Sequence, residues 1–148
     1  MIRFGFAIDV ARPAHEVFAY LTDPSSLREW QGTHEVEQLT DGPIGRGARF
    51  REVHLIMGRR LESITEVVAY EPDRRFHVRI VSGPVPMDGI WELVSVANGT
   101  RVHFSTEGRG PPAARLLEPL MAIAIRRRFR RQHVRLKRAV EGRAGEPA

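Results

Sequence analysis

At 148 residues, with 42% hydrophobic content and no cysteine, the chain has the size and composition of one globular domain, and disulfide bonds and thiolate metal sites are excluded. Its longest apolar run, 120–125, is too short to cross a bilayer, and the N-terminus lacks a signal-peptide pattern, so we expect a cytoplasmic protein. The net charge of +5 is uneven, because the segment from Pro111 onward carries ten basic residues against three acidic ones.

The chain is predicted to begin with a strand followed by two short helices. Apolar residues alternate with others over 4–10, which is the period of a strand with one buried face. Pro13 stands at a favourable first helical position, and apolar residues follow at helical spacing over 15–21. Asp23 is placed to cap a second short helix that carries Trp30.

The middle of the chain is predicted to be a run of strands joined by short turns. Asn98-Gly99 is the strongest hairpin signal, and two prolines stiffen the connection at 83–86. Sequential strands with short turns favour antiparallel pairing, so we expect a meander. The predicted strands are residues 34–39, 48–57, 61–70, 76–82, 87–96 and 100–107.

The last predicted element is a long helix. Two prolines open it, and Pro119 should kink or restart it. From there to Glu141 it would span roughly 30–35 Å. One apolar stripe follows the helix and consists of Met121, Ile125, Phe129, Gln132, Leu136 and Val140. We expect one domain over 1–142, with the helix stopped by Gly142, and a flexible tail over 143–148.

This order of elements predicts a pocket. A sheet needs cover for its apolar face, and a strongly bent sheet is not filled completely by one helix, so we expect a cavity between them. Such a cavity suits a small apolar ligand. Arg128, beside the apolar stripe, is placed to meet a carboxylate or phenolate of that ligand. The apolar residues expected in the wall are Phe6, Ile8, Phe50, Phe76, Trp91, Phe104, Met121 and Ile125.

Four short motifs occur in the same order as in a known superfamily. They are P-A-H-E-V-F-A-Y-L-T-D-P at 13–24, G-R-G-A-R-F at 45–50, Y-E-P-D-R-R-F at 70–76 and N-G-T-R-V at 98–102. Together they resemble START-like (SRPBCC) proteins, most closely the polyketide cyclase/dehydrase group, which has glycine where this chain has Asn98. The resemblance implies an α+β helix-grip fold, in which a curved antiparallel sheet of six to seven strands surrounds the C-terminal helix and a hydrophobic cavity. Because that superfamily includes lipid carriers, hormone receptors and aromatase/cyclases, the resemblance implies little about chemistry.

Glu52 and His54 are the candidate catalytic residues. They share one face of their strand with Phe50, so if Phe50 faces the cavity they form an acid/base pair there, as a polyketide aromatase/cyclase or dehydratase requires. The alternative is that the strand presents Val53 and Leu55 inward and leaves both in solvent. Even inward-facing polar groups more often orient a ligand than catalyse, so we favour ligand binding over enzymatic activity.

The sequence gives no sign of a metal or cofactor. None of the six histidines shows metal-ligand spacing, and no carboxylate–histidine cluster is evident. Glycines at 42–47 do not form a dinucleotide motif, and no G-x-S-x-G elbow of a serine hydrolase occurs. We therefore expect no cofactor.

The arginine-rich segment 126–138 has three interpretations. It is a solvated helix face, a site for anionic lipid headgroups or an acidic carrier protein, or a nucleic-acid site. The third is the weakest, because no aromatic platform accompanies the arginines. The sequence allows a monomer or a homodimer.

Overall fold

The computed structural model describes residues 2–109 and 112–143. The expected flexible tail beyond Arg143, and the helix-opening proline at 111, lie outside these residues. As predicted, a strand and two short helices come first, more strands follow, and a long helix ends the series. The elements are β1 (Ile2–Val10), α1 (Ala14–Thr22), η1 (Pro24–Ser26), α2 (Leu27–Trp30), β2 (Glu35–Gln38), β3 (Arg49–Ile56), β4 (Arg59–Glu71), β5 (Arg75–Ser82), β6 (Met87–Val96), β7 (Gly99–Gly108), η2 (Pro112–Leu117) and α3 (Glu118–Arg143).

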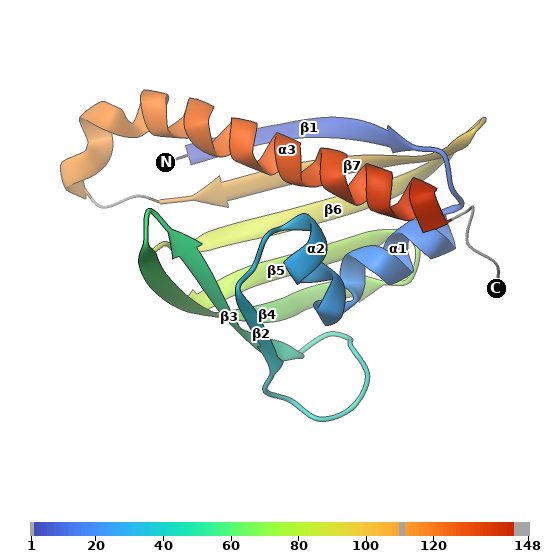
Figure 1. Cartoon of the computed structure of the whole chain (residues 1–148), viewed down its shortest axis with the longest axis horizontal. Coiled ribbons are helices and arrows are strands. Elements are labelled where there is room, and N and C mark those ends of the chain that lie inside the picture. The colour runs from blue at the N-terminus through green and yellow to red at the C-terminus, as the bar shows by residue number, and fades with distance from the viewer. Residues whose placement is uncertain (1, 110–111, 144–148) are drawn as a thin grey trace.

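The strands form one seven-stranded antiparallel sheet in the order β1-β7-β6-β5-β4-β3-β2. Strands β2 to β7 follow one another as hairpins, which confirms the predicted meander. β1 joins at the far edge, where Ile2 pairs with Gly108 and Val10 with Thr100. The predicted α+β class, with a curved sheet against a long C-terminal helix, is therefore confirmed (Figure 1).

The β3–β4 turn ends β3 one residue earlier than predicted. Met57 and Gly58 have φ of 53° and 77°, so both central residues of the turn lie in the left-handed region. This is the backbone of a tight hairpin turn that matches strand twist. Because Met57 belongs to the turn and not to the strand, its side chain is free of the strand's alternation and is 97% exposed.

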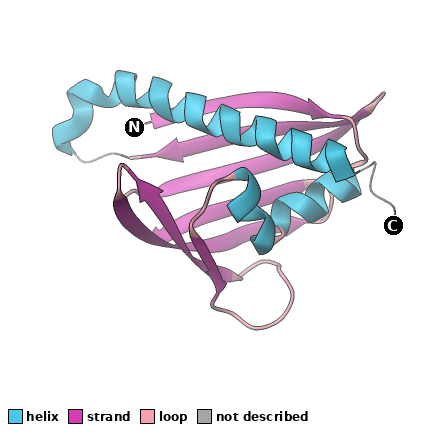
Figure 2. Ribbon diagram, viewed as in Figure 1, coloured by secondary structure: helices cyan, strands magenta, loops and turns pink. Residues whose placement is uncertain are grey.

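α3, α1 and α2 lie on the same face of the sheet, and α3 runs along β1 and β7 (Figures 1 and 2). Pro119 is the second residue of α3, directly after the 3-10 helix η2, so the helix restarts there as predicted. The helix continues through Gly142 to Arg143, past its predicted stop. A glycine at the last turn weakens a helix without necessarily ending it. Asp23 caps η1 as expected, since its carboxylate accepts from Ser25 N at 3.0 Å.

Candidate ligand-binding cavity

A cavity of about 300 Å³ lies between the inner face of the sheet and the helices. Its walls come from strands β3 to β7, from the segment Leu21–Gln31, and from the inner side of α3. Most of these side chains are apolar. Its volume is at the lower end of the range for small-molecule sites.

Six of the residues expected in the wall line the cavity. They are Phe50, Phe76, Trp91, Phe104, Ile125 and Arg128. Phe6, Ile8 and Met121 do not line it in the described part of the chain. β1 is the edge strand beside α3, and Phe6 packs between them with its ring centroid 5.0 Å from that of His133. Met121 lies on α3 one turn before Ile125, the first residue of the helix in the wall.

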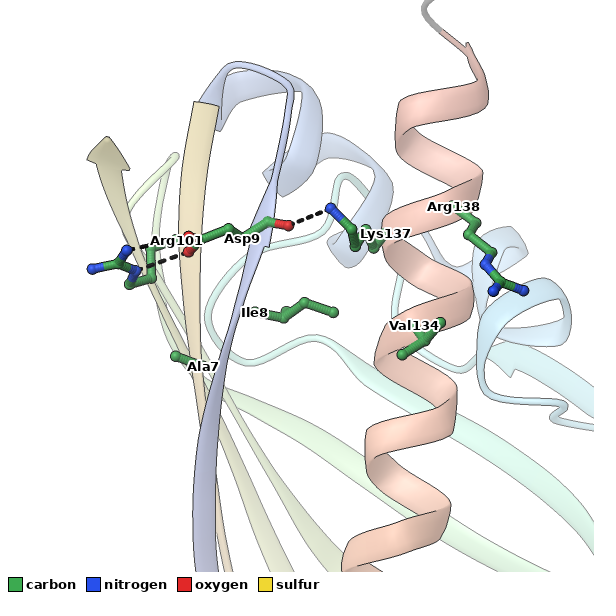
Figure 3. A pocket seen from close by; sticks show the side chains of 7 residues that line it. All are labelled: Ala7, Ile8, Asp9, Arg101, Val134, Lys137 and Arg138. Atoms are coloured by element: carbon green, nitrogen blue, oxygen red, sulfur yellow. Dashed lines mark hydrogen bonds and ion pairs between the residues drawn. The ribbon is translucent and has the colours of Figure 1, made fainter. Parts of the chain in front are cut away.

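Ile8 instead lines a second, open hollow on the surface between β1 and α3 (Figure 3). Three of the four charged residues of this hollow, Asp9, Arg101 and Lys137, already bind one another, and the fourth is Arg138. Arg101 donates to the Asp9 carboxylate at 2.8 and 3.1 Å, and Lys137 Nζ donates to the Asp9 carbonyl at 2.7 Å. A hollow that is open to solvent and in which most charged groups are already paired offers a ligand little, so we assign the ligand site to the inner cavity.

Glu52 and His54 face the cavity together, in the orientation that places Phe50 inward. The Thr65 hydroxyl on β4 donates to Glu52 Oε2 at 2.9 Å. Burial raises the pKa of Glu52 above its ordinary value, and the Thr65 hydrogen bond opposes that change only in part. No hydrogen bond joins Glu52 to His54 among the contacts of the described residues.

Two polar side chains of α3 in the cavity wall, Arg128 and Gln132, have atoms without a partner in the described residues. Burial and then the positive charge of Arg128 lower the pKa of His54, so the guanidinium lies near the imidazole. Within the described ranges, Arg128 forms no ion pair. One turn later Gln132 is 6% exposed; its Nε2 donates to the Gln31 carbonyl at 3.3 Å, whereas its Oε1 has no partner in residues 2–109 and 112–143. The helix thus presents a cation to whatever fills the cavity, whereas the Gln132 oxygen is covered by protein atoms.

His133 is a buried polar residue that the predicted stripe missed. The Trp91 indole can only donate, so its 2.9 Å contact makes His133 Nε2 an acceptor, and Nδ1–H donates to the Phe129 carbonyl at 2.7 Å. Burial lowers the pKa of His133 to about 4, so the ring is neutral at neutral pH. Its spacing of four from Phe129 and three from Leu136 is the signal that could have found it.

His133 is the centre of a set of rings that we name the aromatic cluster. Ring centroids lie 4.6 Å from it at Phe104 and 5.3 Å at Trp30. The members are Phe4, Phe6, Trp30, Trp91, Phe104, Phe129 and His133. Four of them, Trp30, Trp91, Phe104 and Phe129, also line the cavity, so the cluster forms one of its walls.

Two further properties of the described residues bear on function. They contain no group of three or more histidine, aspartate or glutamate side chains arranged to hold a metal ion. In the same part of the chain, no helix combines the length and the apolar composition that a membrane span needs.

The sequence matches the model of the family described as polyketide cyclase / dehydrase and lipid transport over residues 1–141. The chain belongs to this family. A search of curated protein sequences gave no match. Among solved structures, TTHA0849 from Thermus thermophilus is similar with a TM-score of 0.81 and 18% identity, over 97% of this chain and 99% of that one.

Other similar structures share the same architecture at low identity. The protein of unknown function SA2116 from Staphylococcus aureus has a TM-score of 0.80 at 12% identity, covering 98% of this chain and 96% of its own. Protein NE0264 from Nitrosomonas europaea has a TM-score of 0.75 at 16% identity, covering 98% of this chain and 97% of its own. At such identities the likeness shows the fold alone.

Proposed function

We propose that the protein binds an apolar small molecule that carries an acidic group, with its apolar body in the cavity and its acidic group at Arg128. The observation that carries this proposal is an unpaired guanidinium in the wall of a mostly apolar cavity. The family description, which names polyketides and lipid transport, supports an apolar ligand.

The chemistry of the wall favours an acidic group over a neutral one. A half-buried guanidinium without a carboxylate partner gains most from an anion that accepts two of its hydrogen bonds, such as a carboxylate, phenolate or sulfonate. Fatty acids, polyketides and ring compounds with an acidic substituent all meet this description.

The test is a pair of fluorescent probes with one ring skeleton, anilinonaphthalene sulfonate and the uncharged phenylnaphthylamine. We expect the protein to bind both probes. Arg128→Gln should lower the affinity for the sulfonate roughly ten-fold and leave the affinity for the neutral probe unchanged, since a charge-assisted hydrogen bond is worth about 1.5–3 kcal/mol. Arg130→Gln, on the exposed side of the same helix, is the control and should change neither affinity.

Native mass spectrometry of the purified protein completes the test, because it detects a copurifying molecule directly. Failure of both probes to bind, with no copurifying molecule, would contradict ligand binding altogether. If Arg128→Gln lowers the affinity for both probes equally, the cavity remains the binding site, but the preference of Arg128 for an acidic group is refuted.

A second candidate function is a polyketide cyclase or dehydratase. It is favoured by one observation, that Glu52 and His54 face the cavity side by side with pKa values shifted toward their neutral forms. A neutral imidazole accepts a proton from an acidic carbon, and a protonated carboxyl donates to a carbonyl oxygen. His54→Ala should then leave the fold intact and abolish turnover of a poly-β-ketone substrate; unchanged turnover would dismiss this candidate.

A further inference from the structure

Exposed apolar side chains gather at the end of the sheet that the cavity reaches. Ile56 lines the cavity, and the next residue, Met57, is exposed at the tip of the β3–β4 turn. Val85, in the β5–β6 connection, lines the cavity and is itself exposed. Both turns lie at the same end of the molecule as the start of α3, on the left in Figure 1.

η2 and the first turns of α3 add four more exposed apolar side chains to this end. Leu116 is 94% exposed, Leu120 67% and Ile123 53%, just before Ile125 enters the cavity wall. We name the set the apolar rim, and it consists of Met57, Val85, Leu116, Leu117, Leu120 and Ile123. Side chains of this size, contributed by three separate segments around one cavity, are uncommon on a surface that faces only water.

The apolar rim continues directly into basic residues. Leu120, Ile123, Arg127 and Arg130 are spaced three, four and three apart, so they form one exposed stripe of α3. Within the described residues, no carboxylate pairs with the exposed arginines of this region, which are Arg126, Arg127, Arg130 and Arg131. Arginines of the sheet surface differ, since Arg49, Arg79 and Arg101 each pair with a carboxylate.

From this juxtaposition we propose that the apolar rim and the adjoining arginines form a docking surface for a lipid bilayer with anionic headgroups. The rim enters the boundary between headgroups and acyl chains, and the arginines meet the headgroup phosphates. A nucleic acid has no use for the exposed leucines, and an acidic protein would need a shaped counterpart to turns from three segments. A bilayer accommodates both the exposed apolar side chains and the arginines without such a shaped counterpart. It also delivers an apolar ligand to the end of the cavity without passage through water.

The first test is cosedimentation of the full chain with vesicles. We expect binding to vesicles of phosphatidylglycerol and phosphatidylcholine that weakens with salt, and much weaker binding to pure phosphatidylcholine. The double change Arg127→Gln/Arg130→Gln should lower affinity roughly twenty-five-fold, about five-fold for each arginine. The double change Leu120→Ser/Ile123→Ser should lower it roughly ten-fold or more.

Matched controls use the opposite end of the molecule. Arg46→Gln/Arg74→Gln removes the same charge from two exposed turns, and Val94→Ser removes an exposed apolar side chain from the outer part of β6. Neither should change vesicle affinity. Loss of binding in the charge control equal to that in Arg127→Gln/Arg130→Gln would overturn the proposal, because it would show attraction by net charge alone. No binding to anionic vesicles at low salt would overturn it as well.

Insertion itself is measured with brominated lipids. Emission of a tryptophan introduced by Leu120→Trp should be quenched by them, whereas that of Val94→Trp should match the background of the buried Trp30 and Trp91. Absence of added quenching in Leu120→Trp would refute the placement of the rim in the bilayer. Binding of an oligonucleotide that equals vesicle binding and is unaffected by Leu120→Ser/Ile123→Ser would also overturn the proposal and assign the arginines to nucleic acid.

Discussion

The space between the sheet and α3 has two halves that differ in what fills them. Beside β1 and the C-terminal half of α3, rings of the aromatic cluster pack around His133, and both nitrogens of that histidine are hydrogen-bonded. Beside β3 to β7 and the first half and middle of α3 lies the cavity, whose wall leaves the Arg128 guanidinium without an ion pair among the described residues. The second half of this helix thus packs mainly into the core, and we propose that the first half and middle contact a ligand.

The largest difference in the free energy of unfolding is expected between side-chain truncations of equal size in the two halves of α3. Leu136 is fully buried in the filled half, so Leu136→Ala should lower the free energy of unfolding by about 2–5 kcal/mol. Ile125 borders the cavity, so Ile125→Ala should cost about 1 kcal/mol or less, because little packing is lost beside a space that is already empty. Urea denaturation of both variants measures the difference; equal losses would show that the two halves are packed alike.

Acid should destabilise the protein through His133 in the filled half. The pKa of His133 is about 4 in the folded protein against an ordinary value of 6.5. Between these values the unfolded chain binds the proton and the folded protein does not, so stability is lost as pH falls. The expected loss is about 3 kcal/mol from pH 6.5 to 4. His133→Gln should flatten this pH dependence in urea denaturation measured against the unmodified protein; an unchanged slope would contradict the neutral, buried histidine.

Substitutions that enlarge a side chain should also affect the two halves differently, because only the cavity has room for added atoms. Val102 is fully buried, so Val102→Phe should overpack the filled half and cost about 1–3 kcal/mol. Ile80 faces the cavity, and Ile80→Phe should change stability by about 1 kcal/mol or less while lowering probe affinity roughly ten-fold. Retained probe binding in Ile80→Phe would place the ligand elsewhere.

Sequence patterns predicted the fold well because they report which face of an element is buried. Alternation over 4–10, the Asn98-Gly99 turn and the stripe on the long helix each correspond to an element of the structure. The boundaries that moved are those set by local backbone geometry, as at Met57, whose left-handed φ no alternation reveals. The extension of α3 past Gly142 is of the same kind.

The site was harder to predict, since alternation gives a face and not a distance from the cavity. Phe6 and Phe104 both face inward and pair across β1 and β7, yet only Phe104 reaches the cavity, because the sheet order puts β1 at the edge. Arg128 was found because it lies beside the apolar stripe. His133 was missed because a histidine among arginines gives no sign of the ring contacts that bury it.

The last comparison concerns Glu52, in the half that contains the cavity. Burial raises the pKa of this carboxyl above its ordinary 4.5, so the stability contributed by its neutral form is present below pH 4.5 and is lost as pH rises through the folded-state pKa. Glu52→Gln carries no such proton and keeps an acceptor for the Thr65 hydroxyl. Its free energy of unfolding, relative to that of the unmodified protein, should therefore increase from pH 4 to 8. Glu92→Gln, at an exposed position of β6, is the control for the exchange of a glutamate for a glutamine. A relative stability of Glu52→Gln that decreases with pH would mean that the wall favours a charged carboxylate, which would then repel the acidic ligand that we propose at Arg128.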